Sequence, residues 1–272
     1  MMSRTMFFVS DGTAITSETM GHALLVQFPQ IICRQVRIPF VDDKDSAFEA
    51  VRQINAASRK DKAFSIVVST IVDEELSAII HGSESIVLDL FTAFLNTLEE
   101  ALGEKPQPTV GRSLGLKDFE RYEDRMDATN FALSHDDGES IEFGNAELIL
   151  VGVSRSGKTP TCLYMALHYG VKAANYPLTE NELDEMRLPP FLRRHKRKIV
   201  GLMIEPDRLA QIRETRKPNS RYASLKQCHK EIDLAEALFR TEGIPVLHST
   251  HSSIEEISSR VLMELGLQKE MF

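Results

Sequence analysis

The first hundred residues alternate short apolar runs with stretches of helical spacing. Residues 17–28 and 47–57 place apolar side chains at intervals of three and four, which indicates helices. Four runs, partly β-branched, are typical of strands: residues 6–9, 34–40, 64–69 and 86–90. Strands separated by helices indicate βαβ units and a largely parallel sheet. We therefore predict an open α/β domain over residues 1–103.

This pattern is interrupted after residue 103. The segment Gly103-Glu104-Lys105-Pro106-Gln107-Pro108 is polar and holds two prolines, so it predicts a linker. Residues 117–134 then read as a charged amphipathic helix, followed by the polar turn His135-Asp136-Asp137-Gly138. The buried side of this helix is expected to include Phe119, Tyr122, Met126, Phe131 and Leu133. Residues 104–145 are thus assigned to a linker and connecting helix.

A second α/β pattern occupies residues 146–272. A helix is expected from about residue 253 to 265, where Ser252 with Glu255 and Ser253 with Glu256 form two overlapping capping boxes. Strands are expected at residues 147–151, 171–178, 198–204 and 243–247. The fold class that follows is α/β throughout, with a mainly parallel sheet in the second domain as well.

Composition adds few restrictions. The chain is 42% hydrophobic and 26% charged, as folded proteins usually are. No apolar run approaches the roughly 20 residues of a membrane span, and the N-terminal apolar run is too short for a secretory signal. Cys33, Cys162 and Cys228 are widely spaced, which favours neither a disulfide framework nor a zinc site. We expect a cytoplasmic protein with free thiols and no membrane association.

The charge is distributed unevenly. The net charge of −8 disfavours nucleic-acid binding by the chain as a whole. Between Arg187 and Lys230, however, 13 Lys and Arg residues stand against three acids, so this segment is expected to meet phosphate or an acidic partner. RNA binding by the segment is disfavoured, because only Phe191 and Tyr222 could stack on bases.

One motif carries most of the chemistry. The pattern G-x-x-x-x-G-K-[ST] lies between a predicted strand and a predicted helix and comprises Gly152, Val153, Ser154, Arg155, Ser156, Gly157, Lys158 and Thr159. Its glycines let successive backbone N–H groups turn toward phosphate oxygens, and the helix adds its positive end. Lys158 can bridge terminal phosphates and the Thr159 hydroxyl can hold Mg²⁺. A chance match on a surface turn is the alternative, but the flanking strand and helix favour a P-loop kinase-like nucleotide site.

Two neighbouring features leave alternatives open. The strand 198–204 is followed by Glu205 and Asp207, which either place an acid near the metal or only mark a strand-to-turn boundary. Arg208, Arg213 and Arg216 recur at spacings that suit either an arginine-rich lid over a transferring phosphoryl group or a solvated basic helix face.

Several separated motifs, taken together and in order, resemble the bacterial phosphoenolpyruvate synthase regulatory protein family, whose relatives regulate pyruvate, phosphate dikinase. The resemblance covers nearly the whole chain. It is carried by residues 10–14, 122–138, 152–159, 173–177 and 219–224, and by Ser249 and Thr250 with the helix that follows them. It implies a bifunctional regulator that uses ADP to phosphorylate a threonine of its target and inactivate it. In the other direction such proteins use inorganic phosphate to remove that group, and diphosphate is released.

The resemblance also suggests roles for single residues. The ADP phosphates would lie on the loop amides with Lys158 and Mg²⁺. A general base must assist the target threonine, and its candidates are Asp11, His135, Asp136 and Asp137. Asp11 follows a strand end, where open α/β sheets place functional groups, although a helix cap is the alternative; for residues 135–137 the alternative is a polar turn. The phosphate used in the reverse direction calls for a second anion site, for which Arg155, Arg208 and Arg221 are candidates.

Three other functions stay open at this point. The target could be pyruvate, phosphate dikinase, although overall likeness favours phosphoenolpyruvate synthase. The chain could also be an ATP-dependent small-molecule kinase or a non-catalytic module that senses adenylates. Whether both reactions share one centre is open, and a homo-oligomer is compatible with all of these functions.

Overall fold

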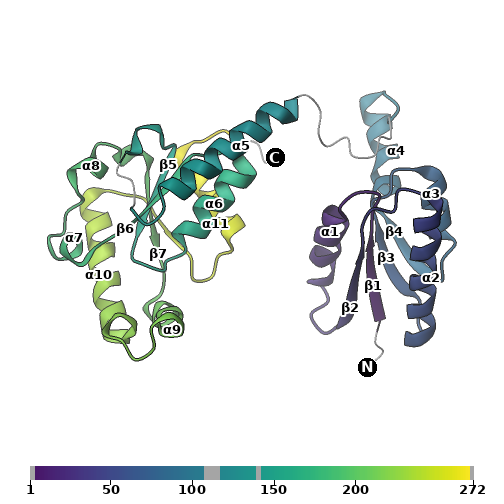
Figure 1. The fold of residues 1–272 in the computed structure, drawn as a ribbon, viewed down its shortest axis with the longest axis horizontal. Helices are drawn as coiled ribbons and strands as arrows, with labels where there is room; N and C mark the ends of the chain where they lie inside the picture. The colour runs from purple at the N-terminus through teal and green to yellow at the C-terminus, as the bar shows by residue number, and fades with distance from the viewer. Residues whose placement is uncertain (1–3, 107–116, 139–141, 270–272) are drawn as a thin grey trace. The chain divides into compact units, whose positions relative to one another are not determined.

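The computed structural model describes residues 4–106, 117–138 and 142–269, except for the side chains of residues 117–121. The chain forms two compact units, Met1–Gly115 and Leu116–Phe272, each built of parallel strands and helices (Figure 1). The predicted α/β fold class is confirmed. In the described residues, no helix combines the length and the apolar character that crossing a membrane requires.

The first unit contains a four-stranded parallel sheet in the order β2-β1-β3-β4. Its strands are β1 (Arg4–Val9), β2 (Cys33–Ile38), β3 (Ser65–Ser69) and β4 (Ser85–Asp89). Its helices are α1 (Ile15–Leu25), α2 (Lys44–Asp61), α3 (Glu74–His81) and α4 (Leu90–Leu102). Phe7, Val9, Ile54 and Ile80 form the larger core, between the sheet and α2 with α3. The helices α3 and α4 lie where the sequence pattern predicted no element.

The second unit contains another four-stranded parallel sheet, in the order β6-β5-β7-β8. Its strands are β5 (Leu148–Gly152), β6 (Ala173–Pro177), β7 (Ile199–Met203) and β8 (Val246–His248). Its helices are α5 (Lys117–Ser134), α6 (Lys158–Tyr169), α7 (Glu180–Asp184), α8 (Pro190–Arg193), α9 (Pro206–Arg216), α10 (Leu225–Glu242) and α11 (Ile254–Leu265). One core packs α5, α6 and α11 on one face of the sheet, and a second core packs α10 and its neighbours on the other (Figure 1).

Helix α5 is present where the sequence predicts it, but its buried side differs. Ala128 and Ala132 are buried against the second unit's core, whereas Tyr122, Met126 and Leu133 are exposed. Phe131 is partly buried as expected, and the side chain of Phe119 lies outside the described residues. The physical reason is close packing of α5 on α6: only small side chains fit between two helices whose backbones approach closely.

Only one of the two predicted capping boxes is present at the start of α11. Ser253 is the N-cap, its side chain accepts from the amide of Glu256, and the Glu256 carboxylate accepts from the Ser253 amide. Ser252 precedes the cap, so its predicted box with Glu255 is wrong. Ile257 and Val261 form the buried face of α11, as predicted.

The strand order fixes where a ligand can bind in the second unit. From β5 the chain passes to β6 on one side and then to β7 on the other, so the strand order reverses between β5 and β7. In open parallel sheets, ligands bind in the crevice beyond the carboxyl ends of the strands at such a point. The segment between β5 and α6 lies there and contains the predicted phosphate loop.

Candidate functional site

The backbone of the phosphate loop, residues 152–159, depends on two glycines. A Cβ on Gly152 would collide with the carbonyl oxygen of Leu202 in β7, so only glycine lets β5 end so close to its neighbour. Gly157 has φ +97°, a conformation that glycine adopts without steric cost. Arg155 also has a positive φ, 77°, which makes it the one strained side-chain position among the described loop residues.

Side-chain donors hold four carbonyl oxygens of the loop. Lys158 Nζ donates to Val153 O (2.9 Å), and Arg213 donates to Ser154 O (3.1 Å). Ser249 Oγ donates to Ser156 O (2.8 Å), and Thr161 Oγ1 donates to Gly157 O (2.9 Å). Helix α6 starts directly after Gly157 without a side-chain cap, so its first N–H groups stay available. With the oxygens held away, the loop can present amides and a helix N-terminus to an anion.

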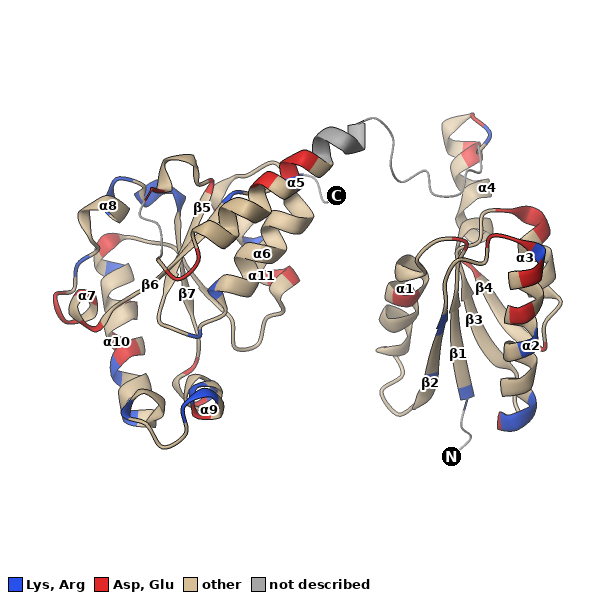
Figure 2. Ribbon diagram, viewed as in Figure 1, with Lys and Arg blue, Asp and Glu red and all other residues tan. Residues whose placement is uncertain are grey.

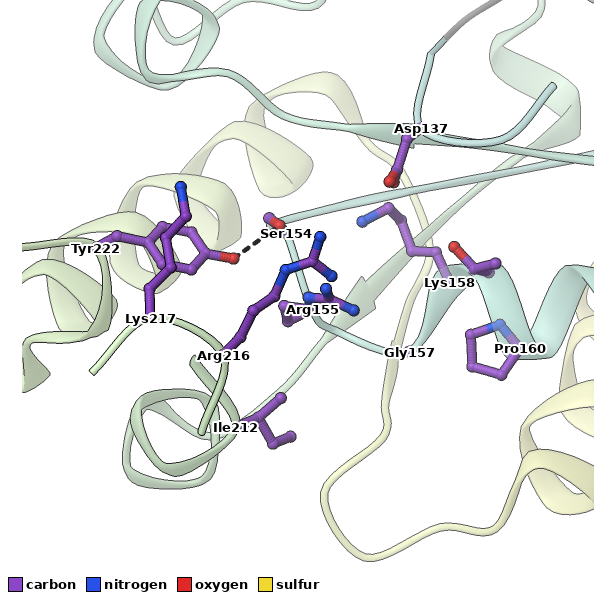
Figure 3. Close-up of a pocket in the computed structure, with 11 residues that line it drawn as sticks. Asp137, Ser154, Arg155, Gly157, Lys158, Pro160, Ile212, Arg216, Lys217 and Tyr222 are labelled. Carbon is purple, nitrogen blue, oxygen red and sulfur yellow. Dashed lines mark hydrogen bonds between the residues drawn. The ribbon is translucent and has the colours of Figure 1, made fainter. Parts of the chain in front are cut away.

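Lys158 is almost completely buried in this loop, with 3% of its surface exposed. Burial lowers the pKa of Lys158 to about 8, and the nearby Asp137 and Asp136 carboxylates counteract part of that effect. Lys158 and Asp137 point toward each other at the edge of a cavity (Figure 3). The lysine is thus placed to meet charged phosphate, and its own charge is easily lost at alkaline pH.

A polar network joins the turn after α5 to the start of α6. Thr159 Oγ1 donates to Asp136 Oδ1 at 2.8 Å, and the amide nitrogen of Asn175 donates to the same oxygen. Asn175 Oδ1 accepts from the backbone N–H of Asp137 at 3.1 Å. No role was predicted for Asn175 from sequence, although a polar residue within the otherwise apolar start of a strand was a usable signal. Asn175 is buried in β6, so it fixes the turn 135–138 beside the loop.

The network fits the expected Mg²⁺. The Thr159 hydroxyl and the Asp136 carboxylate lie together, and Asp137 lines the adjoining cavity. Mg²⁺ prefers such oxygen ligands and keeps its remaining positions for water and substrate phosphates. Among the described residues no cluster of three or more His, Cys, Asp or Glu could hold a metal alone. Glu205, the alternative acid, is exposed and turns to His251 (3.4 Å).

His135 lies beside the network, but its ring faces away from the cavity. The ring stacks on Phe131 with centroids 3.9 Å apart. Its Nδ1 is 2.9 Å from Phe131 O, and its Nε2 is 3.2 Å from Glu142 O. Both ring nitrogens are therefore engaged with backbone carbonyl groups, and the structure does not bring His135 together with Lys158 and Asp137.

Asp11 lies in the first unit, at the carboxyl end of β1. It is buried, and its carboxylate accepts from the backbone N–H of Val72 at 2.8 Å. This bond joins the ends of β1 and β3, and it is not the helix cap considered as an alternative, because the N-cap of α1 is Ala14. The catalytic role assigned to Asp11 stays a prediction.

A cavity of about 450 Å³ adjoins the loop. Asp137 and Lys158 lie on one side of it, and Arg216, Lys217 and Tyr222 lie on the other (Figure 3). Thr159 also lines it. The Tyr222 hydroxyl hydrogen-bonds with Ser154 Oγ at 2.9 Å, which ties the far wall to the loop. The cations on both walls, Lys158 on one and Arg216 with Lys217 on the other, suit a group that carries phosphate.

A second cavity, of about 320 Å³, lies on the other flank of the loop. It shares Arg155, Gly157, Pro160 and Ile212 with the first cavity. The residues that are its own include Arg208, Ser249 and Thr250 and the apolar side chains Ile204, Ile254 and Ile257. Two of the arginines considered for the second anion site, Arg155 and Arg208, meet here, whereas the exposed Arg221 turns toward Glu180 (3.8 Å).

The three arginines of α9 have three different environments. Arg216 lines the first cavity and Arg208 lines the second. Arg213 is fully buried, bonds Glu231 at 2.6 Å and lies over the Tyr222 ring at 4.1 Å. Both predictions for Arg213, a lid residue or a solvated face, are therefore wrong. Its buried side chain instead donates to the carbonyl oxygen of Ser154 in the loop. Burial alone would lower the pKa of Arg213, but the bond to Glu231 raises it above its ordinary value.

The basic side chains of the segment 187–230 also lie in different environments (Figure 2). Arg193 and Lys196 face Glu242, and Lys230 pairs with Asp184. The basic side chains of this segment that line the cavities belong to α9 and the residue that follows it: Arg208, Arg216 and Lys217. This part of the segment meets the site expected to bind phosphate.

Sequence comparisons identify proteins that are similar to this chain. A sequence profile described as kinase/pyrophosphorylase matches residues 6–262. A protein of Stenotrophomonas maltophilia strain K279a, named "Putative phosphoenolpyruvate synthase regulatory protein", is 52% identical over 269 residues, which cover 99% of this chain and 98% of the relative. A protein of the same name from Xanthomonas campestris pv. campestris strain B100 is 50% identical with the same coverage.

Proposed function

This chain belongs to the kinase/pyrophosphorylase family, and on that premise we propose that it regulates phosphoenolpyruvate synthase by phosphorylating and dephosphorylating a threonine of that enzyme. ADP is the phosphoryl donor in the inactivating direction, and inorganic phosphate is the acceptor in the activating direction. The observation that carries the proposal is the phosphate loop: its carbonyl oxygens are held by side chains, and Lys158 and the Asp136–Thr159 pair lie beside it.

The loop and Lys158 bind the phosphates of the donor. Backbone amides and the start of α6 attract the anion, and the Lys158 ammonium neutralises charge that develops during transfer. Mg²⁺, when bound at Thr159 and Asp136, supplies further neutralisation of phosphate charge. Arg216 and Lys217 on the facing wall attract the anionic group from the other side.

Asp137 is the proposed general base. A threonine hydroxyl is not ionised at neutral pH, so its attack on phosphorus needs a proton acceptor. Asp137 lines the cavity, whereas Asp136 is occupied by Thr159 and Asn175 and His135 faces the core. Its backbone is fixed by Asn175, which keeps the carboxylate at the cavity edge.

The test mixes the full chain with ADP and purified phosphoenolpyruvate synthase. The expected result is a gain of one phosphate mass on a threonine peptide of the synthase. Subsequent addition of phosphate should remove that mass and produce diphosphate. Pyruvate, phosphate dikinase, offered as target in a parallel reaction, should be phosphorylated much more slowly.

Two results would contradict the proposal. Consumption of a metabolite with ATP, without any protein target, would show a small-molecule kinase. Tight ADP binding with no transfer to either enzyme would show a non-catalytic adenylate sensor. A chain with Lys158→Ala serves as the control for contaminating kinases, because it should lose both reactions by roughly a hundredfold.

A further inference from the structure

We propose that the two cavities beside the phosphate loop take different substrates: the purine nucleoside of the nucleotide binds in the second cavity, and the target threonine enters the first. This inference rests on the proposed function, and it deepens it by assigning a place to each substrate. The acceptor and the nucleoside would then approach the loop from opposite flanks.

The second cavity has the surface chemistry that a nucleoside requires. Ile204 and Ile257 are buried at its base, and Ile212 and Ile254 are partly exposed at its edge. Apolar side chains suit the faces of a purine ring, and a few placed polar groups suit its edge and the ribose. The cavity volume, about 320 Å³, falls within the range of small-molecule sites.

Hydroxyl groups line the same cavity at the end of β8. Ser249 Oγ donates to Ser156 O at 2.8 Å, so its lone pairs can accept from a ribose hydroxyl. Thr250 Oγ1 accepts from the backbone N–H of Glu205 at 2.8 Å, so its own proton can be donated to a ligand. Both side chains are therefore already fixed in place by the protein.

The first cavity holds more charged side chains than the second, which is lined by the charged residues Arg155 and Arg208. Its own side chains include Asp137, Lys158, Arg216 and Lys217, which are charged. Such a surface is unfavourable for a purine face, but it matches a hydroxyl that loses a proton and gains a phosphoryl group. The proposed base, Asp137, lies in this cavity alone.

The position in the sheet agrees with this division. The second cavity lies beyond β7 and β8, since Ile204 follows β7 and Ser249 follows β8. This is the side of β5 on which the strand order reverses, where open α/β sheets bind nucleotides. The first cavity lies toward the turn after α5, which packs on β6.

The chemistry of the two directions makes the division measurable. In phosphorylation, the threonine oxygen bonds to the β-phosphorus of ADP, the bond from that phosphorus to the bridging oxygen breaks, and AMP leaves. The threonine proton passes to Asp137. In the reverse direction, a phosphate oxygen bonds to the phosphothreonine phosphorus, the bond from that phosphorus to the threonine oxygen breaks, diphosphate leaves, and the phosphate proton passes to the threonine oxygen. Inorganic phosphate thus takes the place of the α-phosphate of AMP, and only the forward direction uses a nucleoside.

The test is Ile254→Trp, which fills the second cavity. The KM for ADP should rise about tenfold or more, whereas the KM for phosphate should change far less, so the ratio of the two kcat/KM values shifts by about tenfold. Binding should follow: ADP affinity falls by a similar factor, and diphosphate affinity changes little. Ile254→Ala, which adds no bulk, should raise the KM for ADP about fivefold with the same selectivity.

Two further variants serve as controls. Met263→Trp places the same side chain at an exposed position of the same helix, outside both cavities, and should leave both reactions unchanged. The natural chain has no tryptophan, so Ile254→Trp and Met263→Trp each carry a single tryptophan, and ADP should alter the tryptophan emission only at position 254. Lys217→Glu in the first cavity should slow both directions to a similar extent, because the threonine takes part in both.

The outcomes separate the inference from the proposed function. A natural chain with neither reaction would refute the proposed function itself. A natural chain with both reactions, together with Ile254 variants that weaken both directions equally or neither, would overturn the cavity assignment alone. A larger loss of the phosphate-dependent reaction than of the ADP-dependent one would reverse the assignment.

Discussion

The charge of Lys158 changes close to physiological pH. Burial lowers its pKa to about 8, so the side chain is charged below that pH and neutral above it. The charged form is the one that attracts the anionic nucleotide. We therefore expect kcat/KM for ADP to fall as pH rises through about 8, which a pH–rate profile of the free enzyme will report.

Lys158→Arg provides the comparison for that profile. A guanidinium stays protonated throughout the accessible pH range, so the decline of kcat/KM near pH 8 should disappear. The overall rate should be lower, because the planar guanidinium group fits the loop poorly. A variant that keeps the same alkaline decline would assign the titration to another group.

Asp137→Asn tests the proposed base. The amide keeps the size of the carboxylate but cannot accept the threonine proton, so phosphorylation should slow by about a hundredfold while ADP affinity stays nearly intact. Asp136→Asn is the matched change one residue earlier, and it should weaken Mg²⁺-dependent nucleotide binding instead. Calorimetric titration with single-turnover kinetics distinguishes the two. Loss of ADP affinity in Asp137→Asn would make Asp137 a ligand of the nucleotide or metal.

Gly152→Ala should abolish nucleotide binding, because the added methyl group collides with the backbone of Leu202 and displaces the loop. Gly144→Ala is the control: its added Cβ meets no atom within 4 Å, and its φ is not positive. Equilibrium dialysis with ADP and a thermal melt of both variants are the measurements. Normal ADP binding by Gly152→Ala would show that the loop does not need its close approach to β7.

At the scale of secondary-structure elements, α9 and α10 together hold the loop. Arg213 of α9 donates to the loop, and Glu231 of α10 pairs with Arg213. Arg213→Met leaves the Glu231 charge buried without its partner, so the second unit should lose about 3–5 kcal/mol of stability. Arg213→Met with Glu231→Leu should recover much of that loss, because no buried charge remains. Chemical denaturation measures these changes.

Arg216→Met is the matched control on the same helix. Arg216 is exposed, so its loss should change the free energy of unfolding by no more than about 0.5 kcal/mol. An equal loss of stability in both single variants would mean that the helix, and not the buried pair, is responsible.

The elements were predictable from sequence to different degrees. Strands such as β5 are recognisable as short apolar runs. The glycine motif that starts at the end of β5 identifies the phosphate loop. The buried side of α5 was not predictable from hydrophobicity, because close packing on α6 selects Ala128 and Ala132 over larger side chains. Asn175 and Arg213 were missed for a related reason. Their roles arise from contacts with residues distant in sequence, which local patterns do not contain.

At the scale of the whole molecule, each unit has cores of its own. The clusters around Ile54 and Phe8 belong to the first unit, and those around Phe239 and Met165 belong to the second. We expect two unfolding transitions in calorimetry, of which ADP raises only one. At a hundredfold excess over Kd the stabilisation is about 2.7 kcal/mol.

Ile54→Ala identifies the other transition. Ile54 is fully buried in the first unit, so its truncation should cost that unit about 2–5 kcal/mol without changing the ADP-sensitive transition. A single cooperative transition that responds to both ADP and Ile54→Ala would refute the independent unfolding of the two units.

The four donors that hold the loop carbonyls have a consequence for peptide orientation. Lys158 and Thr161 belong to α6, Arg213 to α9, and Ser249 to the segment after β8. Val153 O and Gly157 O also accept from backbone N–H groups, whereas loss of Arg213 or Ser249 releases the carbonyl group of Ser154 or Ser156, and a released peptide can flip. A flipped peptide replaces an inward amide by an inward oxygen, which repels phosphate and attracts cations. Substitution of Arg213 or Ser249 would then convert part of the loop from an anion-binding surface into a cation-binding one.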